Sequence, residues 1–210
     1  MKSSFWIERW QTGETSFHRT EANEALLAHL GTLSLAKGNR VFIPLCGKTV
    51  DIDWLLSQGF RVAGAELSAI AVEEVFERLG IEPSISNEGA LKHYHAAGLD
   101  LFVGDIFKLS AEILRPVDAV YDRAALIALP PAMRQRYAPH IGDVTGGARQ
   151  LLLAVEYDQE KMDGPPFSVN EAEVRELYGN AYAVTCQARA EVPGGIKGKT
   201  PGSEAVWLLK

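Results

Sequence analysis

The feature that most constrains the fold is a strand–loop–helix–strand unit in residues 40–67. It begins with a short apolar run rich in strand formers, passes through a loop that contains Gly47, and then places apolar side chains at helical spacing. Gly59 follows the expected helix, where a left-handed residue is common, and a second apolar strand runs up to Glu66. The pattern predicts two parallel strands joined by a right-handed helical crossover.

Such a crossover places the Gly47 loop and Glu66 at the carboxyl edge of the sheet, where α/β proteins bind nucleotides. Glu66 lies 20 residues after Cys46, the spacing at which an acid contacts ribose hydroxyls in nucleotide-binding units. The loop lacks the G-x-G-x-x-G pattern that lets a backbone approach a pyrophosphate. We therefore expect an adenosine-type ligand rather than a dinucleotide. The same pattern also occurs in crossovers that bind nothing.

Composition limits the partners and the compartment. The 210 residues carry 21 Lys and Arg against 27 Asp and Glu, without a basic cluster, which disfavours a nucleic-acid partner. No stretch approaches the ~18 apolar residues of a membrane span, and the start lacks the pattern of a signal peptide. We expect a cytoplasmic protein with no membrane partner. The size fits one domain over residues 1–210, with a flap and a covering helix in residues 1–35, and we expect a monomer.

The spacing of the cysteines and of His93 and His95 does not indicate a metal site. Cys46 and Cys186 show no C-x-x-C pattern, which predicts two reduced thiols and no zinc site. Cys46 is either a small residue packed under the ligand loop or a reactive thiol, and packing is the more common role. His93 and His95 lie in residues 81–98, where prolines, glycines and weak periodicity predict irregular structure. Because no acidic or cysteine companion lies nearby in the sequence, we expect exposed histidines and no metal.

Two further strands also end in charged side chains. Residues 99–103 predict a strand that leads to Asp105, and residues 117–121 predict one that leads to Asp122 and Arg123. Each acid alone is more often a helix cap than a ligand contact. Their recurrence at successive strand ends favours a ligand.

The rest of the pattern completes a mixed α/β sheet of seven strands. A fifth strand is expected at 151–155, and the last two, at 181–190 and 205–209, have no helix between them, so this closing pair is antiparallel. Helices are expected after the N-caps Thr20, Ser68 and Ser168 and over residues 132–140.

Two segments could cover a ligand. Trp6 and Trp10 lie four residues apart on one face of a helical turn. They either anchor the chain end to the core or form a flap, and the polar residues 11–16 favour a segment that opens. The proline pair in residues 161–167 prevents regular structure there, and a lid, a pocket wall and a plain connector all remain open.

Several short motifs resemble one family, the thiopurine S-methyltransferases. They are W-x-x-x-W at 6–10, T-S-F-H at 15–18, P-L-C-G-K at 44–48, G-A-E-L at 64–67, Y-D-R-A-A-L at 121–126 and G-P-P-F at 164–167. P-L-C-G-K followed by D-R-A-A-L is highly specific, and order and spacing fit to about residue 185. The resemblance implies the three-layer, Rossmann-like fold of class I methyltransferases and the cofactor S-adenosylmethionine. It also implies methyl transfer to the sulfur of aromatic or heterocyclic thiols, with selenium and tellurium compounds as further acceptors.

The resemblance implies a set of contact residues as well. Those for the cofactor are Trp10, Leu45, Gly47, Glu66, Asp105, Ile106 and Arg123, and those for the acceptor are Phe17 and Arg123. Glu66 would accept hydrogen bonds from both ribose hydroxyls, and the fork of Arg123 suits a carboxylate. The tail does not visibly carry the basic residue that the acceptor pocket has in animal members, and Lys197 or Lys199 is a candidate to replace it.

The implied reaction is in-line displacement at a sulfonium methyl group by a thiolate or thione sulfur. It needs chiefly proximity and alignment, so we expect no dedicated catalytic residue. Two alternatives stay open at this point. An NAD(P)-dependent oxidoreductase would need the missing glycine-rich loop. A non-catalytic sensor of an adenosine ligand would keep Glu66 and Arg123 but lack an open acceptor pocket.

Overall fold

The protein is described by a computed structural model that covers residues 3–15 and 19–210. These residues form a nine-stranded sheet with the order β3-β4-β5-β2-β1-β6-β7-β9-β8. The strands are β1 (Arg40–Pro44), β2 (Arg61–Glu66), β3 (Ser84–Glu88), β4 (Leu91–Ala96), β5 (Leu99–Val103), β6 (Ala119–Arg123), β7 (Arg149–Tyr157), β8 (Val184–Glu191) and β9 (Gly202–Leu209). Neighbours from β5 through β2, β1 and β6 to β7 pair in parallel, and the outer strands on both sides pair antiparallel.

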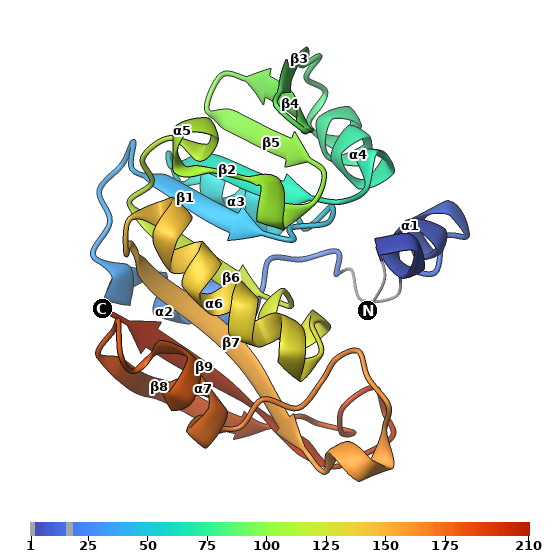
Figure 1. The fold of residues 1–210 in the computed structure, drawn as a ribbon, viewed down its shortest axis with the longest axis vertical. Coiled ribbons are helices and arrows are strands. Elements are labelled where there is room, and N and C mark those ends of the chain that lie inside the picture. The colour runs from blue at the N-terminus through green and yellow to red at the C-terminus, as the bar shows by residue number, and fades with distance from the viewer. Residues whose placement is uncertain (1–2, 16–18) are drawn as a thin grey trace.

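Helices cover both faces of the sheet and give three layers (Figure 1). They are α1 (Ser3–Gln11), α2 (Glu24–His29), α3 (Asp51–Ser57), α4 (Ala69–Leu79), α5 (Ala111–Leu114), α6 (Pro131–Thr145) and α7 (Glu171–Tyr178). Apolar residues of α2, α3 and α4 join one core cluster, and those of α5, α6 and α7 join the other. Alternate residues of β1 serve different clusters, because successive side chains of a strand point to opposite faces.

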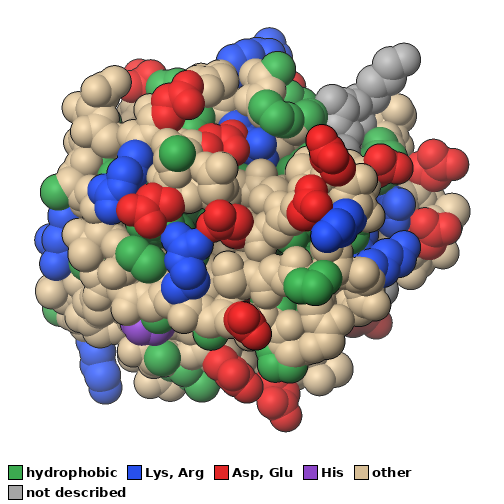
Figure 2. All heavy atoms as spheres, turned by 90° about the horizontal axis from the view of Figure 1, so that it is seen from below, with side chains coloured by type: hydrophobic (Ala, Val, Ile, Leu, Met, Phe, Trp, Pro, Cys, Tyr) green, Lys and Arg blue, Asp and Glu red, His purple; other side chains and the backbone are tan. Residues whose placement is uncertain are grey.

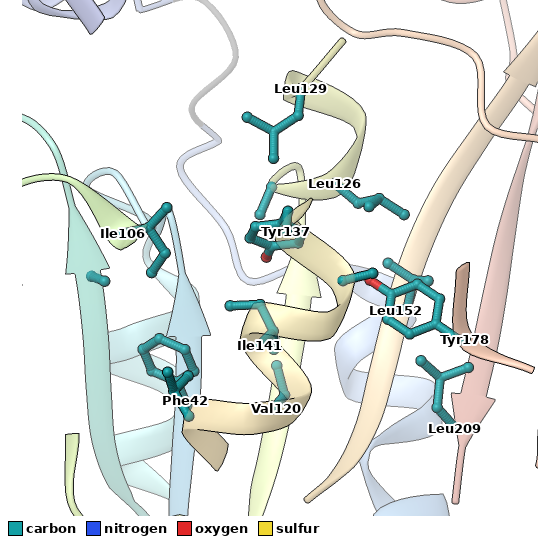
Figure 3. Close-up of a cluster of buried hydrophobic side chains, with 14 of the residues drawn as sticks. Phe42, Ile106, Val120, Leu126, Leu129, Tyr137, Ile141, Leu152, Tyr178 and Leu209 are labelled. Carbon is teal, nitrogen blue, oxygen red and sulfur yellow. The ribbon is translucent and has the colours of Figure 1, made fainter. Parts of the chain in front are cut away.

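The core under α6 shows how the layers pack. Phe42 of β1 and Val120 of β6 lie beside Ile141 and Tyr137 of α6 (Figure 3). These side chains are essentially inaccessible to solvent. Their burial holds α6 against the strands whose carboxyl ends form the site described below.

The predicted crossover and the closing antiparallel pair are confirmed. Strands β1 and β2 are parallel with α3 between them, and Gly59 after α3 has the left-handed φ of 85°. Strands β8 and β9 pair antiparallel. The expected α/β fold with a mixed sheet is therefore correct.

The predicted count of seven strands is wrong. Residues 81–98, expected to be irregular, contain the antiparallel strands β3 and β4 at the sheet edge. Strand β3 is Ser-Ile-Ser-Asn-Glu, and most of it is exposed, including its one large apolar residue, Ile85. An edge strand with no buried face lacks the apolar alternation by which strands are recognised in a sequence.

Two predicted N-caps are also wrong. Helix α2 is capped by Asn23, whose Oδ1 accepts from the N–H of Ala25 at 2.9 Å, and not by Thr20. Helix α7 is capped by Asn170, while the Ser168 hydroxyl accepts from the N–H of Tyr157 at 3.0 Å. In both cases a short polar side chain nearer the helix takes the cap position.

Two further helix predictions have mixed outcomes. Ser68 does occupy the N-cap position of α4, although its side chain makes no capping hydrogen bond. Helix α6 contains Pro139 and continues past the expected end at residue 140, through Gly142, to Thr145. Its buried face includes Ile141 and Val144, so core packing extends the helix beyond the point that local propensity indicates.

The surface is of mixed charge. On the face seen in Figure 2, acidic and basic side chains of the described residues are interspersed rather than gathered into one basic area. Among the helices that the structure describes, none is long and apolar enough to cross a bilayer.

Candidate active site

The carboxyl ends of β1, β2, β5 and β6 open into one cavity of about 680 Å³. Small-molecule sites typically have volumes of roughly 300–1,000 Å³. All the described residues predicted to contact a cofactor line this cavity: Trp10, Leu45, Gly47, Glu66, Asp105, Ile106 and Arg123. Phe17, predicted to contact the acceptor, lies outside the described residues. The structure thus brings the predicted residues together from four strand ends and α1.

Glu66 at the end of β2 is held in place by the backbone. Its Oε2 accepts from the N–H of Gly47 at 2.8 Å, and its Oε1 accepts from the N–H of Ser68 at 2.9 Å. The residue is only 6% exposed, and burial raises the pKa of its carboxyl, opposed by these backbone hydrogen bonds. Each carboxylate oxygen can accept a second hydrogen bond, so both can still receive one from a ligand in the cavity.

The loop after β1 is tight and uses its own amide groups. Leu45 and Gly47 both have left-handed φ values, 47° and 53°. The N–H of Cys46 donates to the carbonyl of Ala65 at 3.0 Å, and the N–H of Gly47 donates to Glu66. A left-handed leucine is strained by about 1–3 kcal/mol, and such strain concentrates at functional sites. Neither amide is available to a pyrophosphate, which argues against a dinucleotide.

Cys46 packs under this loop, as the packing alternative predicted. It is buried, and a Cβ added to Gly64 would lie 2.9 Å from its Sγ, so strand β2 needs glycine at this point. Burial, and then the nearby charge of Glu66, raise the pKa of the Cys46 thiol well above its usual range. At neutral pH the thiol stays protonated, so it is a poor nucleophile.

The end of β5 presents Asp105 and Ile106. Asp105 is exposed and caps the 3-10 helix Ile106–Lys108, accepting from the N–H of Phe107 at 3.0 Å. Ile106 is buried, and its carbonyl oxygen lies 2.8 Å from Nε2 of His140 on α6. Asp105 is therefore a cap, as the alternative reading of strand-end acids allowed, and it also lines the cavity.

The two charged residues at the end of β6 point in opposite directions. Asp122 is fully buried away from the cavity, where its carboxylate accepts from the Tyr137 hydroxyl at 2.7 Å and the Leu126 N–H at 3.1 Å. Burial raises the pKa of Asp122 to about 6. Its neighbour Arg123 lines the cavity and makes no ion pair with a described carboxylate. The expectation that successive strand-end acids share one ligand is thus wrong for Asp122, because neighbouring strand residues face opposite sides.

A hydrogen-bonded pair in the cavity wall was not predicted. The hydroxyl of Tyr121 donates to Asp51 Oδ2 at 3.1 Å, while Oδ1 of Asp51 accepts from the N–H of Asn23 at 2.7 Å. Burial, and then the charge of Asp51, raise the pKa of Tyr121 well above its usual range. Tyr121 could have been found from its position two residues before Arg123 on the same face of β6. Asp51 could not, because its contacts join α3 to a segment 28 residues away.

A cationic group lies in the part of the cavity formed by α1 and by the chain between β8 and β9. Arg9, Lys197 and Lys199 line it together with the apolar side chains of Val192 and Ile196. Partial burial lowers the pKa of Lys197, and the neighbouring charges of Arg9 and Lys199 lower it further. The positive charges near Lys197 favour a bound anion in this part of the cavity, although Arg9 also pairs with Glu14 at 3.4 Å. Lys197 and Lys199 were candidates from the sequence, whereas Arg9 was overlooked beside Trp10.

Two covering segments complete the cavity. Trp10 is 5% exposed and lines the cavity, with Nζ of Lys48 at 5.7 Å from the centre of its ring. Figure 1 shows α1 beyond the carboxyl ends of the parallel strands. Pro165 and Pro166 also line the cavity, so of the roles left open for the proline segment the pocket wall is observed.

Comparison with known proteins identifies the family. Residues 1–207 match the thiopurine S-methyltransferase family. The chain belongs to this family. The match extends through the tail, past residue 185, where the sequence motifs alone had ended. Members of the family are S-adenosylmethionine-dependent methyltransferases, so the chain is an enzyme of this class and S-adenosylmethionine is its cofactor.

Curated members of the family are similar over their whole length. The chain is 55% identical to a thiopurine S-methyltransferase of Xanthobacter autotrophicus, covering 100% of this chain and 99% of that protein. It is 48% identical to one of Gluconobacter oxydans, covering 97% and 92%.

Solved structures share the fold at low sequence identity. A 1,6-didemethyltoxoflavin-N1-methyltransferase of Burkholderia thailandensis, solved with S-adenosylhomocysteine, superposes with a TM-score of 0.64 at 18% identity, covering 99% of this chain and 87% of that chain. The magnesium protoporphyrin IX methyltransferase of Synechocystis, also with S-adenosylhomocysteine, has a TM-score of 0.63 at 14% identity, covering 97% and 98%. These likenesses establish the class I methyltransferase fold.

The residues around the cavity fit the family cofactor. The buried carboxylate of Glu66 retains acceptor capacity toward the cavity, as ribose hydroxyls require. Arg123, which makes no ion pair with a described carboxylate, has a guanidinium suited to a carboxylate ligand. The loop that follows β1 engages its amides internally, which suits a ligand without a phosphate group.

Proposed function

We propose that the chain transfers a methyl group from S-adenosylmethionine to the sulfur of aromatic or heterocyclic thiols such as thiopurines. One observation carries this proposal: a single cavity joins the strand-end residues suited to the cofactor with a second, apolar and cationic part. A sensor of an adenosine ligand would not need that second part. The cavity therefore supports an enzyme with an acceptor rather than a binding module.

On the cofactor side, each residue has a distinct role in the proposal. Glu66 accepts hydrogen bonds from the ribose hydroxyls, while Leu45 and Gly47 let the backbone approach the methionine portion. Asp105 and Ile106 frame the adenine with one polar and one apolar surface. Arg123 pairs with the methionine carboxylate or with an anionic acceptor. The cofactor supplies an electrophilic methyl group on a sulfonium sulfur.

On the acceptor side, apolar walls and positive charges work together. Val155, Ile196 and the proline pair offer a surface for a flat ring. The charges of Arg9, Lys197 and Lys199 favour the anionic form of a bound group, so they lower the pKa of an aromatic thiol and increase its thiolate fraction. A soft anion of selenium or tellurium has the same charge requirement, and we include such compounds among the acceptors.

No side chain needs to act as a general base in this proposal. The hydroxyl of Tyr121 and the thiol of Cys46 both line the cavity, and burial raises the pKa of each, so both stay protonated at neutral pH. A thiolate that enters already ionised needs only to be aligned with the methyl group. Proximity and orientation then supply most of the rate enhancement.

We further propose that residues 1–210 act as one methyltransferase domain, in which residues 1–35 hold a flap and a covering helix. Helix α1 is the flap: it closes over the cofactor and the acceptor through Trp6 and Trp10 and excludes water. We also propose that the active enzyme is a monomer. Sedimentation of the active enzyme checks this expectation.

The test is transfer of labelled methyl from S-adenosylmethionine to a panel of acceptors. The panel contains 6-mercaptopurine, an uncharged and a carboxylated thiophenol, selenide and telluride. We expect label on the sulfur of the aromatic thiols, and mass spectrometry of the product locates it. Tight binding of S-adenosylhomocysteine without transfer to any acceptor would instead indicate a sensor.

A further inference from the structure

Three side chains with metal-binding atoms gather at the edge of the sheet, apart from the active-site cavity. His93 and His95 lie two residues apart on β4 and share one face, and Asp100 of β5 lies directly opposite His95 in the antiparallel register. Nε2 of His93 and Nδ1 of His95 each lie 2.8 Å from Oδ1 of Asp100. Strand pairing therefore places two imidazole nitrogens and a carboxylate oxygen within 4.8 Å of one another.

The surroundings hold these ligands in place. The ring of His93 stacks on Phe102, with centroids 4.6 Å apart and an interplanar angle of 16°. Oδ2 of Asp100, which the histidines do not contact, accepts from Arg40 at 2.7 Å. The Arg40 guanidinium also donates to the carbonyl of Leu114 at the end of α5. His93 and the carboxylate thus have fixed orientations, as metal ligands with supporting contacts do.

The chemistry of the three atoms suits a divalent ion such as zinc. Zinc binds imidazole nitrogen and carboxylate oxygen at about 2.0–2.2 Å in a tetrahedron, which separates ligand atoms by roughly 3.3 Å. The present 2.8 Å contacts need to open by only about half an ångström to reach that spacing. The side chain of His95 is 54% exposed, so water has access to a fourth position.

The charge state of the cluster also suits a cation. Asp100 supplies a carboxylate oxygen, a ligand type that zinc accepts together with imidazole nitrogen. Its ring partners are imidazoles, which bind metal in the neutral form. The charge of Arg40 opposes a second cation, which favours moderate rather than very tight affinity.

We propose that His93, His95 and Asp100 bind one divalent transition-metal ion of the zinc class. None of these residues lines the methyl-transfer cavity, and Asp100 lies near the start of β5 whereas the cavity is at its end. The ion joins β4 to β5 and stabilises the edge of the sheet without entering the reaction. The sequence disfavoured a metal here because the acidic companion, Asp100, becomes adjacent only when β4 pairs with β5, and His93 proves to be buried.

Zinc titration of protein free of any affinity tag tests the proposal, with calorimetry as the readout. We expect one ion per chain for the wild type and a rise in Tm on adding zinc. His95→Ala removes an exposed ligand with little effect on the fold and should weaken zinc binding at least tenfold. His29→Ala on α2 is the matched control and should bind as the wild type does.

The variant Asp100→Asn distinguishes between a metal site and a cluster that is held only by hydrogen bonds. The amide oxygen still accepts from the histidines but is a weak ligand for zinc, so the variant should lose zinc binding. Cobalt(II) gives an independent readout, since visible absorption of a tetrahedral ion should appear in the wild type and vanish in both variants. Absence of zinc binding by the wild type, or binding unchanged in His95→Ala or in folded Asp100→Asn, overturns the proposal.

Discussion

The two sides of the active-site cavity are built in different ways. The inner side consists of strand ends whose polar groups are fixed by backbone contacts, as Glu66 is by the N–H groups of Gly47 and Ser68. The outer side consists of α1, which carries Arg9, and the chain between β8 and β9, which carries Lys197. Neither segment belongs to the parallel strands. The parallel sheet therefore determines the cofactor site. In the proposed function the covering segments hold the acceptor, apart from Trp10 of α1, which also faces the cofactor.

Deleting residues 1–12 should have the largest effect, because it removes α1 from the outer side of the cavity. We expect methyl transfer to fall on the order of 100-fold, because the acceptor is then no longer held in line and water enters the cavity. The sheet should remain folded, as judged by circular dichroism.

The same segment can be tested in the intact protein. If α1 closes over the ligand, S-adenosylhomocysteine should protect residues 5–15 from hydrogen exchange. Equal protection with and without the ligand would show that Trp6 and Trp10 are permanent core anchors.

On the inner side, Glu66→Gln should weaken binding of S-adenosylhomocysteine by about tenfold or more. The amide retains one acceptor but loses the charge that strengthens hydrogen bonds to hydroxyl groups. Calorimetry measures the change, and Glu77→Gln on the exposed side of α4 is the control. If the Gln variant loses its folded state, as seen by circular dichroism, Glu66 is needed for structure rather than for the ligand.

On the outer side, Lys197→Ala should raise KM for a carboxylated thiophenol by about two- to fivefold, as expected for a partly exposed charge. KM for an uncharged thiol should change less, and affinity for the cofactor should not change. Lys37→Ala, which removes an exposed charge elsewhere, is the control. An equal rise in KM for both thiols would show that Lys197 shapes the pocket without acting through charge.

The smallest effect on methyl transfer is expected from Asp122, which supports the inner side without lining the cavity. Its pKa is raised from 3.8 to about 6 in the folded protein, so the folded state holds the proton more tightly than the unfolded state. The contribution of Asp122 to the free energy of unfolding is then largest below pH ~4. It declines by up to about 3 kcal/mol as the pH rises to about 6.

Asp122→Asn removes this titration because the amide stays neutral at every pH. Denaturation at several pH values should show that the decline between pH ~4 and 6 is smaller in the variant than in the wild type. Activity at neutral pH should change little. A decline of the same size in both proteins would assign the pH dependence to other groups.

The sequence allowed correct predictions where the geometry of parallel strands fixes which residues meet. It did not allow them where residues meet only because distant segments pack together. Glu66, Asp105 and Arg123 were placed correctly because the carboxyl ends of parallel strands meet at one edge. Asp122 was misplaced because the alternation within β6 was not applied to its last two residues. Strand β3 was missed since an exposed edge strand carries no apolar alternation.

Contacts between distant segments account for the remaining differences. Asp51 forms hydrogen bonds with Tyr121 and with the backbone of Asn23 in the cavity wall. No local sequence pattern predicts these contacts. His93 and Asp100 are likewise close only because β4 and β5 pair. The sequence shows the basic residues of the outer side, but it does not show that they lie close together. Their proximity depends on how α1 and the tail lie over the sheet.

The most direct test of the division between the two sides is one set of steady-state measurements with crossed variants. Methyl transfer to a carboxylated thiophenol is measured while S-adenosylmethionine and the acceptor are varied in turn. The account predicts that Glu66→Gln raises KM for S-adenosylmethionine alone, and that Lys197→Ala combined with Lys199→Ala raises KM for the acceptor alone. If both KM values rise together in both variants, the cavity does not have separate cofactor and acceptor sides.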